Sequence, residues 1–424
     1  MKKVFKKISL SLMIFGIGVC VTLLYTNNKY KVYEEEETKQ IKKHVDTISM
    51  MLETEAGSGN YEMTTRENWP KDGYVFNTEL SKCENGGELL WDDENKRVLM
   101  SGNVSDKCYV YFDKVLTLAD YVKSLYTGTQ GENGIYYHDS SLTNGAGDNS
   151  YRYAGASEDV NNFVCFGTNA SPCPADNLYR MIGVFGDKVK LIKYEYVNSD
   201  LYLINNVDSN LLGTDGDYKE FTKAYSTYKG SFQVLDFFYW NNSTQKNTWS
   251  ESLLNKTNLN TNFIINIGSE WSQKIATTTW KVGGSAGVFS VPSVTYQNEV
   301  VNPEPGSTST TGETEYTSQI GLMYVSDYGF AADPGAWTTS VYNYDGSVND
   351  STIRSLNWMY MGMDEWTITR IPSDSDGVYL VSYNGNVNGG YAKTGRMVRP
   401  SFSLLSSIIY KSGSGTQSDP ILIN

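Results

Sequence analysis

Histidine is almost absent from this 424-residue chain, which contains only His44 and His138. Two histidines so far apart in the sequence give no basis for a His-rich zinc site or a Ser-His-Asp triad. The cysteines lack the C-x-x-C spacing of thiolate metal sites, and no motif points to a pair of catalytic carboxylates. We therefore expect no catalytic residues, no metal and no cofactor, and interpret the chain as a non-enzyme.

Positive charge is also in short supply. The chain has 35 Lys and Arg residues against 48 Asp and Glu residues, which gives a net charge of −13. A nucleic-acid-binding protein needs a cationic face, so we expect no nucleic-acid partner. An acidic balance suits an exported, soluble surface instead.

The chain has a single long apolar run, residues 8–25, preceded by four lysines. Its length is close to the roughly 17–25 residues that cross a bilayer. No A-x-A cleavage site follows, and a positive flank stays on the cytoplasmic side. We therefore expect residues 1–30 to form a cytoplasmic flank and a transmembrane signal anchor. This predicts a single-pass protein of the cell membrane whose C-terminal domain is extracellular.

The four cysteines beyond this run are even in number, as in exported proteins with disulfides. They are Cys83, Cys108, Cys165 and Cys173. Their order along the chain favours the pairs Cys83–Cys108 and Cys165–Cys173. In the chain-entropy model the first pair would contribute about 3 kcal/mol.

Two short regions follow the anchor. Residues 31–57 are charged and end at two glycines, and four apolar residues recur there at helical spacing: Ile41, Val45, Ile48 and Leu52. We predict a stalk helix over residues 31–57 and a small β spacer over residues 58–114, where short strand-like runs alternate with turn residues. An anchor, a helix and a β unit in this order resemble the layout of type IV pilin-like proteins. The Gly-Phe prepilin junction and the membrane-embedded Glu of those proteins are absent.

Residues 115–424 read as one large domain with long loops. Within it we predict a helix at 115–126, a hairpin at 177–197, a helix at 249–264 and an exposed polar insertion at about 297–318.

Four motifs of this domain occur in a recognisable order: "NLYRMIGVFGDKVKLI", "NTWSESLLNKTNLNTNFI", "IGLMYVSDYGF" and "EWTITR" followed by "MVRPSFSL". The series resembles a bacterial domain family of unknown function that has a C-type-lectin-like fold and is related to formylglycine-generating enzymes. The most specific part is the closing motif with Val398, Arg399, Pro400 and Leu404. Some members of this broad fold are variable proteins of diversity-generating retroelements. The resemblance implies an α+β chain: a C-type-lectin-like domain with long loops, preceded by a transmembrane and stalk helix and the small β unit.

A stretch before the closing motif is rich in Tyr, Asn, Ser and Gly, the residue types that evolved binding loops use. We interpret it as a ligand-binding face, although strand-like alternation there also fits a structural role. The predicted ligand-binding residues are Trp358, Tyr360, Arg370, Tyr379, Tyr383, Asn384, Asn386, Asn388, Tyr391 and Lys393.

Asp374 and Asp376 in "SDSDG" resemble part of a calcium loop, but the later ligands and the closing Glu are missing. We do not expect calcium there. The resulting hypothesis is a membrane-anchored bacterial cell-surface protein that binds a protein or glycan on another cell or host surface. Two alternatives stay open: a pilin-like structural subunit, and a divergent enzyme similar to the formylglycine-generating enzymes.

Overall fold

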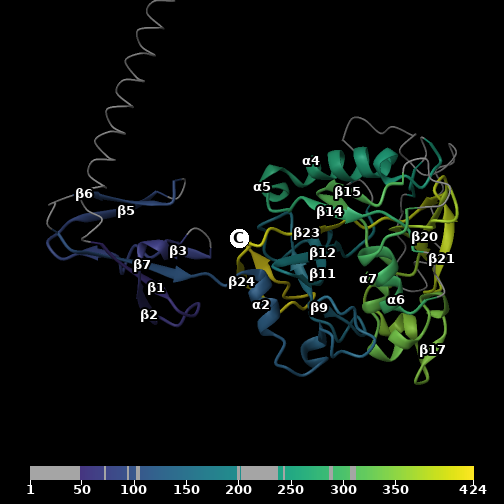
Figure 1. The fold of residues 1–424 in the computed structure, drawn as a ribbon, viewed down its shortest axis with the longest axis horizontal. Coiled ribbons are helices and arrows are strands. Elements are labelled where there is room, and N and C mark those ends of the chain that lie inside the picture. The colour runs from purple at the N-terminus through teal and green to yellow at the C-terminus, as the bar shows by residue number, and fades with distance from the viewer. Residues whose placement is uncertain are drawn as a thin grey trace, which may run out of the picture. The chain divides into compact units, whose positions relative to one another are not determined.

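The computed structural model describes residues 48–70, 73–92, 95–101, 106–197, 201, 237–241, 244–285, 290–305 and 312–424. The chain divides into two compact units, residues 1–115 and residues 116–424 (Figure 1). Each unit has its own hydrophobic core and is described separately.

The first unit is built on a five-stranded sheet with the order β2-β1-β7-β3, in which β4 also pairs with β7. Its strands are β1 (Ile48–Glu53), β2 (Tyr61–Thr64), β3 (Tyr74–Phe76), β4 (Lys82–Cys83) and β7 (Cys108–Lys114), with the helical turn η2 (Arg66–Asn68) and a separate hairpin of β5 (Glu88–Asp92) and β6 (Arg97–Ser101). Every second residue of β7 is buried, so Cys108, Val110 and Phe112 face the core. Phe112 packs there against the rings of Trp91 and Phe76.

The predicted stalk helix over residues 31–57 is wrong at its C-terminal end. Residues 48–53 form β1, which pairs in parallel with β7 so that Met50 lies opposite Val110 in the core. A few apolar residues at helical spacing are a weak signal, and pairing with a long buried strand overrides it. Residues 1–47, which hold the apolar run and the rest of the expected stalk, lie outside the described residues.

The expected single-pass topology and cell-membrane localisation are corrected as well. No helix in the part of the chain that the structure describes is both long and apolar enough to cross a membrane.

Both predicted disulfides are confirmed. Cys83–Cys108 joins the directly opposed residues of β4 and β7, and Cys165–Cys173 ties the end of one strand to the loop that follows it. Within the described ranges, Asp106 and the first cysteine pair are the one cluster of three potential metal ligands. The two sulfurs are bonded to each other, and the Asp106 carboxylate accepts the backbone N–H groups of Asn85 and Gly87.

The large unit is built on a seven-stranded sheet with the order β16-β23-β12-β11-β9-β8, in which β10 also pairs with β11. The strands are β8 (Ile135–His138), β9 (Ser150–Tyr153), β10 (Phe163–Cys165), β11 (Leu178–Phe185), β12 (Lys188–Lys193), β16 (Ile320–Gly321) and β23 (Ser401–Ser403). The predicted hairpin at 177–197 is confirmed as β11 and β12, which turn at Gly186 with a left-handed φ of 66°. The closing strand β23 pairs with β12 and with β16.

Within the described residues, a three-stranded sheet and four strand pairs complete the β structure of the large unit. The sheet is β19 (Glu365–Arg370), β20 (Gly377–Val381) and β21 (Val387–Tyr391), and the pairs are β13 (Phe238–Tyr239) with β22 (Gly395–Arg396), β14 (Thr278–Lys281) with β15 (Glu315–Ser318), β17 (Ser347–Val348) with β18 (Ser351–Thr352), and β24 (Tyr410–Ser412) with β25 (Leu422–Ile423).

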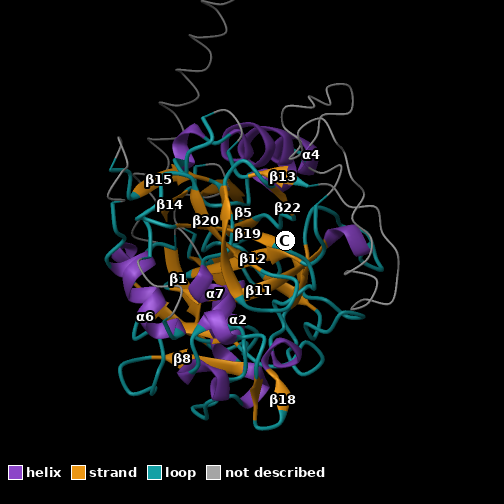
Figure 2. Ribbon diagram, turned by 90° about the vertical axis from the view of Figure 1, so that its right-hand side faces the viewer, coloured by secondary structure: helices purple, strands orange, loops and turns teal. Residues whose placement is uncertain are grey.

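The described helices of the large unit are short (Figure 2). They are α2 (Leu118–Ser124), the π-helical η8 (Leu254–Phe263), α4 (Ile264–Ile267), α5 (Ser269–Ser272), α6 (Pro292–Tyr296), the π-helical η9 (Gln297–Val301) and α7 (Val325–Phe330), with the 3₁₀ turns η3 (Glu132–Gly134), η4 (Ala175–Asn177), η7 (Trp249–Glu251), η10 (Pro334–Thr338), η11 (Val341–Asn343) and η12 (Ile353–Leu356). The predicted helices at 115–126 and 249–264 correspond to α2 and to η7 with η8.

The expected fold class is nevertheless wrong. Strands account for 34% and helices for 21% of the structure, and no helix of transmembrane length precedes the β unit within the described ranges. The predicted exposed insertion at 297–318 is also wrong in part. Glu299 in η9 is buried, and residues 315–318 form β15 against β14. Residues 306–311 lie outside the description.

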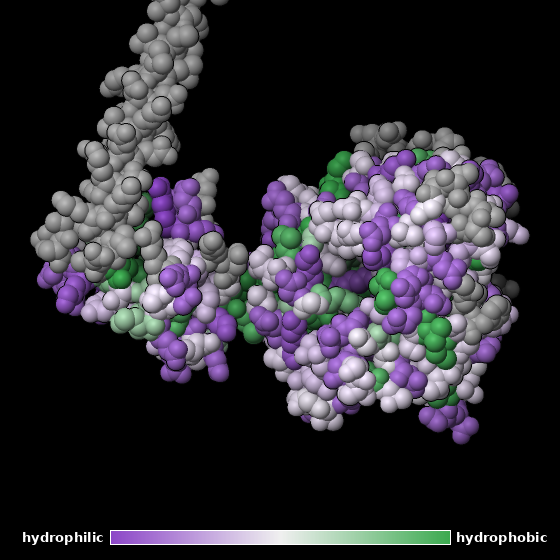
Figure 3. All heavy atoms as spheres, in the orientation of Figure 1, coloured by the Kyte–Doolittle hydropathy of each residue, from purple (hydrophilic) through white to green (hydrophobic). Residues whose placement is uncertain are grey.

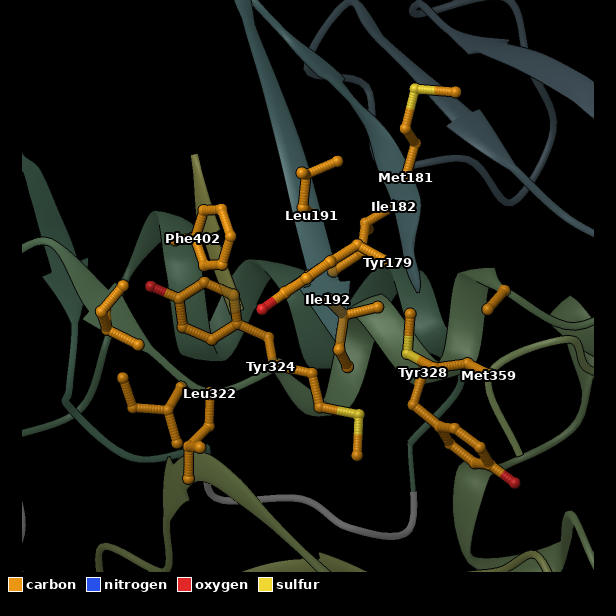
Figure 4. Packing of buried hydrophobic residues seen from close by; sticks show 14 of the residues in the cluster. Tyr179, Met181, Ile182, Leu191, Ile192, Leu322, Tyr324, Tyr328, Met359 and Phe402 are labelled. Carbon is orange, nitrogen blue, oxygen red and sulfur yellow. The ribbon is translucent and has the colours of Figure 1, made fainter. Parts of the chain in front are cut away.

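The core of the large unit lies on the seven-stranded sheet. Figure 4 shows Leu191, Ile192 and Phe402, from β12 and β23, among Tyr324 and Leu322 of the segment that leads into α7. Hydrophilic and intermediate side chains cover most of the face of this unit seen in Figure 3.

Candidate ligand-binding face

The predicted ligand-binding stretch folds into β19, β20 and β21. Tyr379 of β20 lies opposite Gly389 of β21, and Leu380 lies opposite Asn388. All residues of β19 and β20 are buried, whereas β21 is an edge strand with exposed positions at Gly389 and Tyr391. The stretch therefore joins a fully buried layer to an accessible edge.

The turn between β20 and β21 is held by hydrogen bonds from several elements. The hydroxyl of Tyr328 donates to the carbonyl of Gly385 at 2.6 Å, and the hydroxyl of Tyr360 donates to the carbonyl of Tyr383. The backbone N–H of Tyr383 donates to the carboxylate of Asp364 at 2.9 Å. A turn fixed at its backbone presents its side chains in one arrangement, which lowers the ordering cost of binding.

Two glycines are needed for this geometry. Gly385 has a φ of 97°, and a Cβ atom there would lie 2.8 Å from the Cβ of Arg354. A Cβ at Gly390 would lie 2.7 Å from the Cδ2 of Leu380 and close to the ring of Trp366. The glycine content of the stretch is thus explained by close packing under the turn and the edge strand.

The exposed aromatic residues lie along this edge and beside it. Within the described ranges, three aromatic residues are exposed: Tyr342 at 39%, Tyr383 at 61% and Tyr391 at 59%. Tyr383 and Tyr391 lie in the turn and at the end of β21. Tyr342 lies on η11, which contacts β21.

Half of the predicted ligand-binding residues are buried, and we correct their role to scaffold. The buried residues are Trp358, Tyr360, Arg370, Tyr379 and Asn386. The hydroxyl of Tyr379 donates to the carbonyl of Ser285, and the indole of Trp358 donates to the carbonyl of Tyr153. Both faces of the sheet are covered. The alternation of residue types along the strands therefore did not distinguish buried tyrosines from exposed ones.

The other half is accessible: Tyr383, Asn384, Asn388, Tyr391 and Lys393 are exposed or half-buried. Sequence reasoning missed the contribution of Tyr342 and its neighbour Asp345, whose carboxylate lies 3.5 Å from the amide nitrogen of Asn384. The signal was present in "VYNYDGS", which has the same Tyr, Asn and Gly composition. We call the accessible set the tyrosine face: Tyr342, Tyr383, Asn384, Asn388, Tyr391 and Lys393.

The weak calcium candidate consists of two carboxylates only. Burial and the hydrogen bond with Asp374 raise the pKa of Asp376. No further carboxylate, His or Cys joins this pair in the parts of the chain that the structure covers. Two carboxylates fall short of the six to eight oxygen ligands that calcium takes.

His138 is buried in the same unit, at the end of β8. Its Nδ1 accepts the backbone N–H of Ala146 at 3.0 Å, and its ring packs against Phe330 and Trp337. Burial, followed by the charge of Arg152, lowers the pKa of His138 to about 3. The folded state therefore holds this imidazole neutral.

Acid is expected to destabilise the large unit through His138. Its folded pKa lies below the usual value, so its stabilising contribution is present above about pH 6.5 and is lost as the pH falls towards 3. By pH 5 the expected loss is about 2 kcal/mol relative to pH 7.5. Urea unfolding of the wild type and of His138→Asn at pH 5 and pH 7.5 measures this loss of unfolding free energy. The variant should lose less stability than the wild type between the two values. An equal loss in both proteins would contradict the assignment.

No family model, curated protein or solved structure matches this chain in the comparisons with known proteins. The comparisons thus leave the resemblance to C-type-lectin-like domains without a test.

Proposed function

We propose that the large unit is a binding module that captures a protein or glycan ligand on the tyrosine face. The observation that carries this proposal is the position of the exposed aromatic residues along one sheet edge. The three exposed aromatic rings of the described chain all lie on the β20–β21 edge or on η11 beside it.

The chemistry of the face suits recognition rather than packing. Tyrosine rings offer a large, rigid contact area at a low cost in side-chain entropy, and their hydroxyl groups bond to polar partners. Asn384 and Asn388 add amide groups that both donate and accept hydrogen bonds. Lys393 and the nearby Asp345 supply charges of both signs, so the face can bind peptide groups or sugar hydroxyls.

Screening the full chain against a glycan array and an array of extracellular proteins would identify the ligand class. We expect Tyr383→Ala with Tyr391→Ala to weaken binding of the ligand found by about 30-fold or more, since aromatic anchors often contribute about 2 kcal/mol. The free energy of unfolding should stay within about 0.5 kcal/mol of the wild type, because both side chains are exposed.

Leu405→Ala provides a matched control, because Leu405 is an exposed apolar residue of the same unit outside the face. Its affinity should equal that of the wild type. An unchanged affinity in the double tyrosine variant would contradict the proposed function.

A further inference from the structure

A lysine and an aspartate form a buried pair in the large unit. Lys190 lies on β12, and Asp327 lies in the first turn of α7. The Nζ atom of Lys190 lies 2.5 Å from Oδ2 of Asp327, and the two side chains are 8% and 2% exposed. Removing two charges from water costs several kcal/mol per ion. The attraction between the two charges alone therefore does not explain why this pair is buried.

The lysine end of the pair is enclosed by aromatic rings. Nζ lies 4.4 Å from the ring centroid of Tyr324 and 5.3 Å from that of Trp280, with Phe185 at 5.9 Å. Burial lowers the pKa of Lys190, although the charge of Asp327 opposes this shift. Low polarity favours the neutral amine, which is the nucleophilic form of a lysine.

A third acid lies in the same buried cluster. The carboxyl oxygens of Glu299 accept the backbone N–H of Ser326 and the hydroxyl of Thr369, both at 2.6 Å. Burial raises the pKa of Glu299 to about 7, and its charge acts on both Lys190 and Asp327. The negative charge of Glu299 favours the ammonium form of Lys190, and this effect is lost when Glu299 is protonated.

The carboxyl group of Asp327 is polarised from its other side. Its Oδ1 lies 3.7 Å from Nη1 of Arg152, whose Nη2 is bound by Asp148 at 2.7 Å. Its Oδ2 accepts the backbone N–H of Tyr324 at 2.9 Å. A cation at Oδ1 stabilises negative charge that develops on this oxygen when a nucleophile attacks the carbon.

From this arrangement we propose that Lys190 and Asp327 condense to an intramolecular amide bond. A proton passes from the ammonium group of Lys190 to the carboxylate of Asp327, which leaves a neutral amine and a carboxylic acid. Nζ then attacks Cγ, the new C–N bond forms and the C–Oδ2 bond breaks. One of the two amine protons moves to Oδ2, which leaves as water, and the other stays on the amide nitrogen.

The reaction changes no oxidation state and consumes no co-reactant, and its only by-product is water. It removes both buried charges and replaces them with a neutral amide, whose burial costs less than that of two ions. The product would link β12 to α7 covalently, across 137 positions of the chain.

The intact mass of the full chain, measured after denaturation, tests the proposal. We expect a mass lower by one water, about 18 Da, than the sequence predicts after allowance for both disulfides. Tandem mass spectrometry of a protease digest should find one branched peptide that joins Lys190 to Asp327. A mass without this loss would overturn the proposal and leave the two residues as an ion pair.

Lys190→Arg is the matched control, because arginine keeps the positive charge but its guanidinium does not condense. Cyclisation at a step such as Asp345–Gly346 also releases water, so the same loss in this variant would overturn the proposal.

Discussion

Replacing Arg399 with methionine is expected to lower the free energy of unfolding by about 3–5 kcal/mol. Arg399 and Glu365 are each 1% exposed, and the guanidinium binds both carboxylate oxygens, at 2.8 and 2.9 Å. Its Nη2 also donates to the carbonyl of Met359 at 2.7 Å. Removing the arginine leaves the Glu365 carboxylate buried without its counter-charge, and this unpaired charge destabilises the folded state.

The double variant Arg399→Met with Glu365→Leu distinguishes the stability lost through the unpaired charge from the stability lost through changed packing. Replacing a buried ion pair by apolar residues of similar size is often close to neutral. We therefore expect the double variant to recover most of the stability lost by Arg399→Met in urea unfolding. A double variant as unstable as the sum of the two single variants would show that the two residues contribute independently, and would contradict the expected coupling.

Trp366→Ala is expected to destabilise the large unit by about 3–5 kcal/mol through the cavity it leaves. Trp366 is fully buried on β19, packs next to Gly390 of β21, and donates its indole N–H to the carbonyl of Phe238 at 2.8 Å. The side chain thus fixes the strand that carries Tyr391.

Chemical denaturation of Trp366→Ala and of Tyr383→Ala compares the free energy of unfolding lost at a buried and at an exposed aromatic residue. Tyr383→Ala should unfold at nearly the wild-type denaturant concentration, because its ring is exposed. Equal losses from both changes would mean that Tyr383 is part of the core, which would remove it from the tyrosine face.

The sequence was most informative where local signals and tertiary structure agree. The β11–β12 hairpin has a turn at Gly186 between two strand-like runs. Helix α2 is preceded by its N-cap residue Thr117, whose hydroxyl accepts the N–H of Asp120. The disulfides followed from the even number of cysteines and their order. The hairpin and the helix depend on residues that are close in the sequence, and the disulfides on the number and order of the cysteines. A single sequence is therefore sufficient to predict them.

Prediction failed where distant contacts decide the outcome. Residues 48–53 have apolar residues at helical spacing, but the partner strand β7, far along the chain, makes them a strand. Tyr379 and Tyr383 have the same composition around them, yet the hydroxyl of Tyr379 reaches Ser285, while Tyr383 lies in the exposed turn. Both faces of β20 are buried because of how the folded unit packs, and the spacing of apolar residues in the sequence does not indicate this.

The same limit applies to the buried charges. Nothing in the sequence near Lys190 indicates that Asp327 is its partner, because the two residues meet only when β12 and α7 pack together. The seemingly exposed "NEVVNPEP" segment likewise provides Glu299, one of the most buried acids of the described chain.

Hydroxyl-radical footprinting of the full chain, with and without the ligand found by array screening, tests the binding face most directly. The proposed function predicts that oxidation of Tyr383 and Tyr391 decreases when the ligand is bound, while oxidation of the half-buried Tyr109 and Tyr137 is unchanged. Protection of Tyr109 or Tyr137 with unchanged oxidation of Tyr383 and Tyr391 would contradict it, because the ligand would then bind elsewhere on the chain.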